Sequence, residues 1–225
     1  MIIVESKRIA AETAVDYIID GMIVGLGTGS TAYWAIQKIG KRVKDGLNIR
    51  AIATSDNSEK MAKELGIELV PFSEIDEVDI TIDGADEVDL EMNMIKGGGG
   101  ALLREKIVAG TSKQLIIIVD ESKLVKRLGK FPLPVEVVKF GYEVTMKKLN
   151  KLGCAPGLRI LDSRPYVTDN GNYIIDCVFG NIDDPKKIHN EINGVTGVVD
   201  NGLFINMAKK VIVGYQDGKV KQIKR

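Results

Sequence analysis

Apolar residues in the first 130 positions alternate between short continuous runs and helix-spaced stripes. The runs are rich in β-branched residues and bounded by polar residues or glycine, as strands buried in a parallel sheet are. They predict strands at residues 23–26, 49–54, 68–71, 78–82 and 114–120. The stripes between them predict helices at residues 31–43, 55–66 and 100–109. This alternation favours an α/β fold, with a mostly parallel sheet and helices on both faces.

After residue 130 the pattern changes. Pro132 and Pro134 are typical of an edge-like connection, which here leads into a strand. A helix at 142–152, strand segments at 158–162 and 166–179 with a hairpin turn at 169–172, and a helix at 185–192 follow. They predict a small α+β domain of ferredoxin-like type at residues 131–206. Two tail strands around Asp217 and Gly218 are expected to rejoin the first sheet, giving a first domain of residues 1–130 plus 207–225.

Composition excludes several classes of protein. Lys plus Arg and Asp plus Glu both number 31, so the basic excess of a phosphate-backbone binder is missing and we expect no nucleic-acid partner. Charges at Glu5, Lys7 and Arg8 interrupt any signal-peptide core, and no run of about 18 apolar residues predicts a membrane span. Cys154 and Cys177 lack CxxC spacing and are expected to be free thiols, with a disulfide between them as the alternative. A reducing, cytoplasmic location follows.

The single histidine restricts the chemistry. His189 lies in a segment that predicts an exposed amphipathic helix, so a solvated role is expected for it. A histidine-rich metal site is excluded, and a Ser-His-Asp triad would need His189. Acid–base work in an enzyme would therefore fall to carboxylates or lysines, and we expect neither metal nor cofactor.

The motif GLGTGST at residues 25–31 joins a predicted strand to a predicted helix. Its glycines let backbone amides approach an anion, the hydroxyls of Thr28, Ser30 and Thr31 add donors, and the helix start adds a positive dipole end. It is not a Walker A loop, because no lysine precedes the serine, and its third glycine comes too early for a dinucleotide fingerprint. The alternative is a capped strand–helix turn without a ligand.

Carboxylates crowd the end of the predicted strand 78–82, in the string DGADEVD at residues 83–89. Ligands of open α/β sheets gather outside the carboxyl ends of strands, and crowded carboxylates raise one another's pKa or hold a metal. The spacing does not fit an EF-hand loop. We expect Glu87 and Asp89 to be solvated.

Lys96 precedes four glycines and a predicted helix, which resembles a second anion nest. At about 100° per residue, Glu105 falls between Val108 and Ala109, inside the apolar stripe of that helix. Desolvation there is expected to raise its pKa toward the range of a general base. The alternative is a buried structural ion pair. Lys123, after the strand 114–120, is expected at the same sheet edge.

These motifs together suit proton transfer next to a carbonyl in a phosphorylated small molecule. The chain resembles the type A ribose-5-phosphate isomerase family. The resemblance rests on stretches that run in order over most of the chain, namely GLGTGSTA, TSD, DGADEVD, MIKGGGGALLREKIVA, ESK, LGKFPLPVEV, VTDNGN and GVVDNGLF.

The resemblance implies a Rossmann-like α/β domain that carries a small ferredoxin-like domain. It also implies an aldose–ketose isomerase of the non-oxidative pentose phosphate pathway, acting on ribose 5-phosphate and ribulose 5-phosphate through an enediolate without metal or cofactor. It implies that Glu105 is the proton-shuttling base, and that Asp83, Asp86 and Lys96 contact substrate hydroxyls and assist ring opening. Lys7 and Lys123 are implied as phosphate partners, and a homodimer or homotetramer as the assembly. The remaining residues implied at the substrate are Thr28, Gly29, Ser30, Thr31, Gly84, Ala85, Gly97, Gly98 and Gly99.

Two rival interpretations stay open at this point. One is a related enzyme on a similar sheet that handles another sugar phosphate or an acyl-CoA. The other is a non-catalytic sensor domain that binds sugar phosphates. A sensor would need neither Glu105 in the apolar stripe nor the combination of Lys96 and Asp83, and it would usually carry a DNA-binding segment, which the sequence does not predict.

Overall fold

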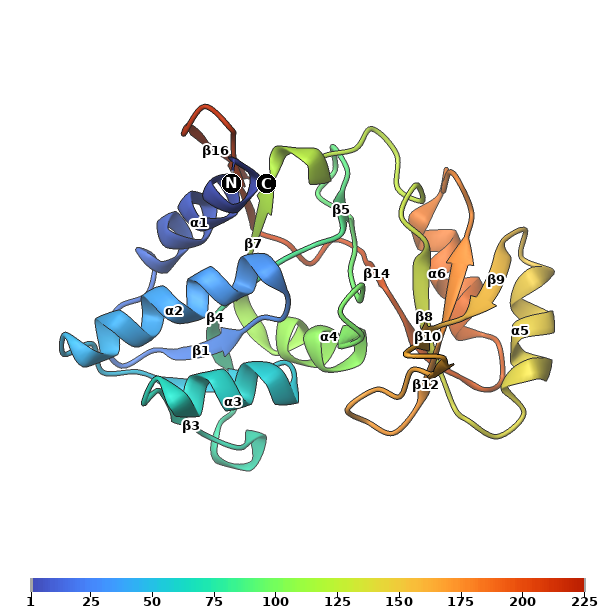
Figure 1. Cartoon of the computed structure of the whole chain (residues 1–225), viewed down its shortest axis with the longest axis horizontal. Helices are drawn as coiled ribbons and strands as arrows, with labels where there is room; N and C mark the ends of the chain where they lie inside the picture. Colours follow the sequence, from blue (N-terminus) through green and yellow to red (C-terminus); the bar gives the residue numbers. More distant parts are fainter. Residues whose placement is uncertain (1, 225) are drawn as a thin grey trace. The chain divides into compact units, whose positions relative to one another are not determined.

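The computed structural model describes residues 2–224, which form two compact units (Figure 1). Unit 1 comprises the chain up to Ala85, Arg104–Lys123 and the chain from Met207 onward. Unit 2 comprises Asp86–Leu103 and Leu124–Asn206. Each unit has its own apolar core, and each is described separately below.

Unit 1 is built on a seven-stranded sheet in the order β16-β15-β7-β4-β1-β2-β3. All neighbouring strands are parallel except β16, which runs antiparallel to β15. The predicted mostly parallel, Rossmann-like sheet is confirmed. The strands are β1 (Ile23–Leu26), β2 (Arg50–Ala53), β3 (Glu68–Leu69), β4 (Val78–Asp83), β7 (Ser112–Asp120), β15 (Lys210–Gly214) and β16 (Val220–Lys224).

Helices cover both faces of this sheet. Val24 and Ile80 point to one face and belong to the same core cluster as Ile36 and Ala62, on the helices of that side. On the opposite face, Val108 packs with Ile52 of β2 in a second cluster. The first side carries α1 (Ile2–Val15), α2 (Ser30–Lys44) and α3 (Asp56–Glu64), and the second carries α4 (Leu102–Gly110). Helix α1 is not among the helices that the sequence pattern predicts. Two 3₁₀ turns, η1 (Phe72–Glu74) and η2 (Glu121–Lys123), complete the unit.

Unit 2 contains a four-stranded antiparallel sheet in the order β13-β8-β12-β9. Val135 and Ile175 of this sheet form a core with Leu149 and Ile192 of two helices. The strand–helix–strand repeat and this strand order are those of a ferredoxin-like fold, as the sequence predicts. The elements are β8 (Leu133–Val137), α5 (Tyr142–Asn150), β9 (Ala155–Leu158), β12 (Tyr173–Val178), α6 (Pro185–Asn193) and β13 (Val198–Asn201), with a small hairpin of β10 (Ile160–Leu161) and β11 (Arg164–Pro165).

Residues 86–103 and 124–130 pack with unit 2, although the sequence analysis assigned them to the first domain. The reason is a third sheet, in the order β14-β6-β5, formed by β5 (Glu87–Val88), β6 (Met94–Ile95) and β14 (Leu203–Phe204). Backbone hydrogen bonds from Lys96 to Gly202, 2.9 Å, and from Ile182 to Leu128, 2.8 Å, attach both segments to the smaller unit.

The expectation that Glu87 is solvated is wrong. Its side chain is buried, and its two carboxylate oxygens accept the backbone amides of Gly129 at 2.7 Å and Phe131 at 2.6 Å. Asp89 is half-buried and accepts the amide of Asn93 at 2.8 Å. These carboxylates therefore accept hydrogen bonds from backbone amides of the loops. A backbone amide that folding removes from water needs such an acceptor within the protein.

The single histidine and the two cysteines lie in unit 2, and all three side chains are at least partly buried. The His189 ring is half-buried, not solvated as expected, with Nδ1 3.2 Å from Asn201 Oδ1. Cys154 and Cys177 are both buried and free, so the disulfide alternative is wrong.

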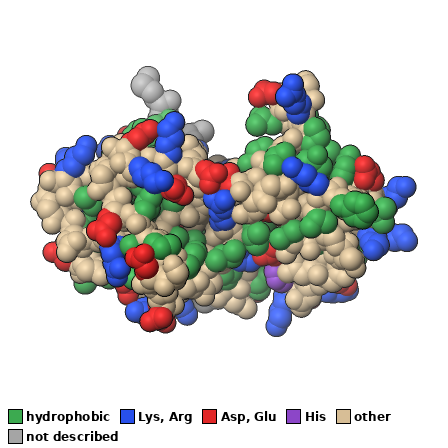
Figure 2. Space-filling view, turned by 90° about the horizontal axis from the view of Figure 1, so that it is seen from below, with side chains coloured by type: hydrophobic (Ala, Val, Ile, Leu, Met, Phe, Trp, Pro, Cys, Tyr) green, Lys and Arg blue, Asp and Glu red, His purple; other side chains and the backbone are tan. Residues whose placement is uncertain are grey.

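Within the part of the chain that the structure describes, no helix is long and apolar enough to cross a bilayer. On the face seen in Figure 2, basic and acidic side chains are interspersed and form no basic stripe.

Glu136 on β8 anchors the loop that follows β11. The carboxylate is fully buried, and its Oε1 accepts hydrogen bonds from Thr168 at 3.0 Å, Asn170 at 3.1 Å and Asn172 at 2.9 Å. Since Glu136→Ala leaves these donors without their acceptor, we expect it to lower the free energy of unfolding by about 3 kcal/mol. Urea unfolding measures this, with Glu143→Ala on the exposed side of α5 as the control. An unfolding midpoint equal to that of the wild type would contradict the assignment.

Candidate active site

The strand order of unit 1 reverses between β1 and β4. From β1 the chain adds β2 and β3 on one side, and from β4 it adds β7 and β15 on the other. In open α/β sheets, ligands bind outside the carboxyl ends of the strands at such a switch point. The loop of residues 27–29 follows β1, and Asp83 is the last residue of β4. The topology therefore places two of the predicted motifs at the preferred ligand-binding edge of this sheet.

Asp83 is joined directly to the loop after β1. Its carboxylate is 1% exposed, and its Oδ1 accepts the amides of Thr28 at 3.0 Å and Gly84 at 2.7 Å. A Cβ at Gly27 would lie 2.2 Å from the same oxygen, so only glycine permits this approach. Thr28 and Asp83, two of the predicted substrate-binding residues, are thus brought together.

The start of α2 has the features of a phosphate site. Gly29, the N-cap residue, precedes the helix at φ 104°, a conformation that favours glycine, and it has no side chain that could cap this end. The first-turn amides and the helix dipole therefore face a position suited to an anion. The Lys7 ammonium, from α1, donates to the Ser30 hydroxyl at 3.0 Å. A predicted phosphate partner is thereby held at this helix start.

The hydroxyls of Thr28 and Thr31 lie differently from that of Ser30. Thr28 Oγ1 is 2.7 Å from the Thr54 hydroxyl and 2.9 Å from the Ser55 hydroxyl, in a cluster beneath the loop. Thr31 is buried, whereas Ser30 is exposed. The Thr28 side chain thus ties the loop to the turn between β2 and α3, and Ser30 presents its hydroxyl at the helix start.

Glu105 lies in the first turn of α4 and is 4% exposed, whereas Ile107 on the same helix is 49% exposed. Its expected position on the buried face is confirmed. The neighbouring Arg104 is engaged with Asp56 at 2.6 Å. A buried carboxylate at the start of a helix is favoured by the dipole and shielded from bulk water.

The end of β7 carries a further carboxylate. Asp120 is 2% exposed, and its Oδ1 accepts the amide of Ser122 at 3.0 Å as well as the Ser122 hydroxyl. Lys123 follows at the end of η2 and is half-buried. Asp120 and Lys123 belong to unit 1 and lie at and just after the end of β7, the strand next to β4.

Unit 2 holds the second group of predicted residues. Lys96 follows β6 and is 1% exposed, with its Nζ 5.4 Å from the centre of the Phe204 ring. The adjoining glycine loop, residues 97–100, is exposed at Gly98 and Gly99. The Gly98 amide donates to Asp86 Oδ2 at 2.8 Å. The loop and Asp86, both predicted at the substrate, therefore form one hydrogen-bonded structure.

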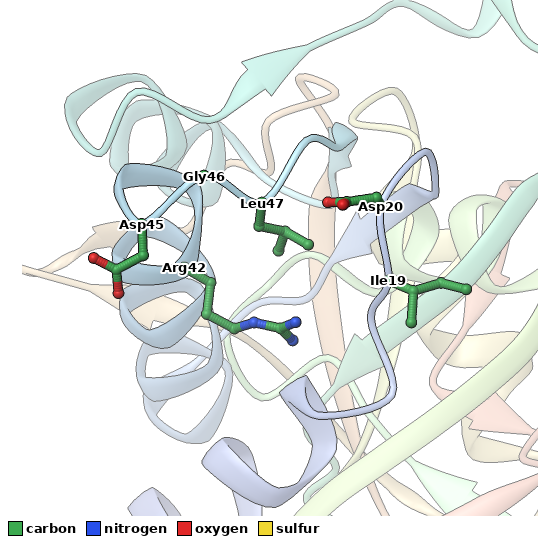
Figure 3. Close-up of a pocket in the computed structure, with 6 residues that line it drawn as sticks. All are labelled: Ile19, Asp20, Arg42, Asp45, Gly46 and Leu47. Atoms are coloured by element: carbon green, nitrogen blue, oxygen red, sulfur yellow. The ribbon is translucent and has the colours of Figure 1, made fainter.

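None of the predicted site residues lines the hollow in Figure 3. This hollow, of about 580 Å³, lies before β1 and β2, at the amino ends of the strands. Its lining residue Arg42 donates to the Val15 carbonyl at 2.7 Å, a structural contact between helices. Within residues 2–224, no group of three or more His, Cys, Asp or Glu side chains is arranged to hold a metal ion, the acidic string at 83–89 included.

Comparison with known proteins gives a consistent result. Residues 50–218 match the family model of ribose 5-phosphate isomerase A, also called phosphoriboisomerase A. The chain is 56% identical to ribose-5-phosphate isomerase A of Bacillus mycoides (strain KBAB4) over 213 residues, 94% of this chain and 96% of the relative. It resembles the solved structure of ribose 5-phosphate isomerase A from Methanocaldococcus jannaschii at 43% identity and a TM-score of 0.93, covering 98% of each chain.

A second solved relative is a D-ribose-5-phosphate isomerase in complex with phospho-erythronic acid, at 40% identity and a TM-score of 0.94, covering 98% of each chain. The fold and these relatives define the class of the protein as an isomerase on a Rossmann-like sheet. The chain belongs to the ribose 5-phosphate isomerase A family.

Proposed function

We propose that the chain interconverts D-ribose 5-phosphate and D-ribulose 5-phosphate through an enediolate, within the non-oxidative pentose phosphate pathway. The isomerase class follows from membership of the family. The observation that carries the mechanism is Glu105, a carboxylate only 4% exposed in the first turn of α4. A carboxylate shielded from water is one of the side chains that can act as the general base for proton transfer next to a carbonyl.

The proton balance uses one base. On the open-chain aldose, the Glu105 carboxylate removes the hydrogen of C2 as a proton, and the electron pair of that bond forms a double bond between C1 and C2. The carbonyl oxygen on C1 takes up the negative charge of the enediolate. The carboxyl proton of Glu105 exchanges with solvent while the enediolate is bound. Glu105 then gives a proton to C1, and the hydroxyl proton on O2 passes to O1. The product is the ketose, with no net change in protons.

We assign the other predicted residues to binding and charge stabilisation. Asp83, Asp86 and Lys96 contact the sugar hydroxyls and assist ring opening, and Lys96 with the amides of the glycine loop stabilises the enediolate oxygen. The phosphate is bound by Lys7, Lys123, Ser30 and the amides at the start of α2. The support for the phosphate assignment is the helix start with glycine at its N-cap, together with the Lys7–Ser30 contact of 3.0 Å.

The ligand of the relative supports this substrate class. Phospho-erythronic acid combines a phosphate, sugar hydroxyls and a carboxylic acid. Its carboxylate is planar and anionic, as an enediolate is, so a site that accepts it is suited to the intermediate proposed for this chain.

Incubation of the purified chain with ribose 5-phosphate tests the proposal. We expect formation of ribulose 5-phosphate to equilibrium. Tight binding of ribose 5-phosphate without turnover would favour the sensor interpretation. Turnover of another sugar phosphate alone would favour the related-enzyme interpretation.

We expect isomerisation to be independent of metal ions, because the proposed steps need only a base and fixed hydrogen-bond donors. Exhaustive treatment with EDTA followed by gel filtration into metal-free buffer should leave kcat and KM unchanged. A loss of activity that one divalent ion specifically restores would make Asp83 and Asp86 metal ligands and would overturn the mechanism.

We also propose that the enzyme works in the cytoplasm as a homodimer or homotetramer. The two free, buried cysteines fit a reducing compartment. Three apolar side chains of unit 2, Val138, Phe140 and Val144, are exposed around the start of α5, with Phe140 at 95%. Exposed apolar groups of this kind mark association surfaces. Light scattering tests the assembly, and a monomeric mass at micromolar concentration would contradict it.

A further inference from the structure

The carbonyl side of the glycine loop is held by two side chains of unit 2. The Arg159 guanidinium donates through Nη1 to the carbonyls of Gly97 at 3.0 Å and Gly98 at 3.2 Å. The Tyr166 hydroxyl donates to the Gly99 carbonyl at 3.4 Å. Burial raises the pKa of Tyr166, so this hydroxyl keeps its proton and stays a donor. Three consecutive carbonyls of a flexible sequence are therefore fixed by side chains that the proposed chemistry does not otherwise use.

Arg159 is itself fixed by the central strands of the small sheet. Its Nε donates to Asp176 Oδ2 at 2.9 Å and its Nη2 to Oδ1 at 2.5 Å, a two-pronged ion pair with side chains 15% and 28% exposed. Asp176 lies on β12 between β8 and β9, paired with Pro134 and Gly157. Paired, charge-assisted hydrogen bonds of this kind fix orientation as well as position. The guanidinium is thus a rigid link between the sheet and the loop.

The geometry of the peptide bond relates the contacts of Arg159 to the direction in which the loop amides point. In a planar trans peptide, the carbonyl of one residue and the N–H of the next point in opposite directions. Because the carbonyls of Gly97 and Gly98 face Arg159, the amides of Gly98 and Gly99 point away from it. The Gly98 amide does so and meets Asp86 Oδ2 at 2.8 Å. Arg159 therefore contacts the carbonyl side of these peptides, and Asp86 contacts the opposite, amide side.

We infer that Arg159, held by Asp176, is a positioning residue for the isomerisation, which sets the direction of the Gly98 and Gly99 amides and, through Gly98, the Asp86 carboxylate. The inference rests on the proposed function in one respect, namely that the loop and Asp86 contact the substrate. Lysine cannot replace the guanidinium, because one ammonium cannot reach both Asp176 oxygens and two carbonyls at once.

Kinetics of Arg159→Ala and Arg159→Lys test the inference. Misplacement of reacting groups by about 1 Å costs on the order of 100-fold, so we expect kcat for ribose 5-phosphate to fall about 100-fold in Arg159→Ala and about 10-fold in Arg159→Lys. KM should change only a few-fold. Arg127→Ala is the matched control, since Arg127 pairs with Asp183 at 2.7 Å on the exposed surface of the same unit, and it should keep wild-type kcat.

Guanidinium rescue separates positioning from simple stabilisation. Guanidinium chloride at millimolar concentration, far below the denaturing range, should restore part of the kcat of Arg159→Ala and have no effect on Arg127→Ala. A kcat near the wild-type value in Arg159→Ala would overturn the inference. So would a loss of kcat that matches a general loss of folded protein and does not respond to guanidinium.

Amide hydrogen exchange measured by NMR gives a readout that needs no activity. In Arg159→Ala the amides of residues 98–100 should exchange faster, while the strand amides of β8 and β12 keep wild-type rates. Unchanged exchange in the loop would overturn the inference even if the wild type is a fully active isomerase. A wild type without isomerase activity would overturn the proposed function, whereas the exchange result would still decide whether Arg159 orders the loop. If Arg159→Ala does not fold, Arg159→Lys and Asp176→Asn decide by the same rates.

Discussion

Glu105→Gln should lower kcat for ribose 5-phosphate by about 100- to 10,000-fold, the contribution of a positioned base, with little change in substrate affinity. The amide keeps the size and polarity of the side chain but cannot accept the C2 proton. Exchange of the C2 hydrogen with solvent should be lost in parallel, because the same carboxylate performs both steps. Steady-state kinetics and exchange of C2-deuterated substrate measure the two effects.

The control for this variant is Glu64→Gln, an exposed position at the end of α3, which should retain full activity. Near-normal turnover and exchange in Glu105→Gln would place the base elsewhere. Asp83, the buried carboxylate at the end of β4, would be the next candidate, and Glu105 would then have a structural role.

Free ribose should be a poorer substrate than ribose 5-phosphate by several orders of magnitude in kcat/KM. Binding energy from the remote phosphate supports the chemical step, and charge-assisted hydrogen bonds to a dianion are strong. The unphosphorylated sugar forfeits the contacts proposed at Lys7 and the start of α2. Comparison of initial rates on both sugars measures the effect.

The variant Lys7→Ala tests whether Lys7 contributes to phosphate binding. It should lower kcat/KM for ribose 5-phosphate and leave that for ribose unchanged, so the two substrates become more alike. Comparable efficiency on both sugars in the wild type would contradict a phosphate site at the Lys7–Ser30 contact.

The sheet of unit 1 could be predicted because its strands are local patterns. The run of β-branched residues in β7 and the alternation of strands with helical stripes are visible within short windows of sequence. The same holds for Glu105, whose burial follows from its angle on the α4 helix. Helix α1 is not predicted by the sequence, because the segment before Val15 mixes charged and apolar residues.

Contacts distant in sequence could not be predicted in this way. Glu87 looks like part of a solvated acidic loop, and its burial depends on the amides of Gly129 and Phe131, more than 40 residues away. Arg159 lies in a segment that reads as an ordinary strand, and its partners in the glycine loop are 61 and 62 residues distant. A short window of sequence cannot predict contacts between residues so far apart, because the tertiary packing determines which residues meet. The proposed roles of Lys96, Asp86 and Lys123 came from the family resemblance alone.

The central claim is that a single protein carboxylate moves a proton through an enediolate, and interconversion in D₂O tests it most directly. Ribose 5-phosphate is incubated with the wild-type chain in deuterated, EDTA-treated buffer and followed by NMR. The account predicts that ribulose 5-phosphate forms with deuterium at C1, and that deuterium also enters C2 of the remaining ribose 5-phosphate. Full conversion with no deuterium at either carbon would contradict a proton shuttle through a carboxyl group that exchanges with solvent, and is the result expected of direct hydride transfer.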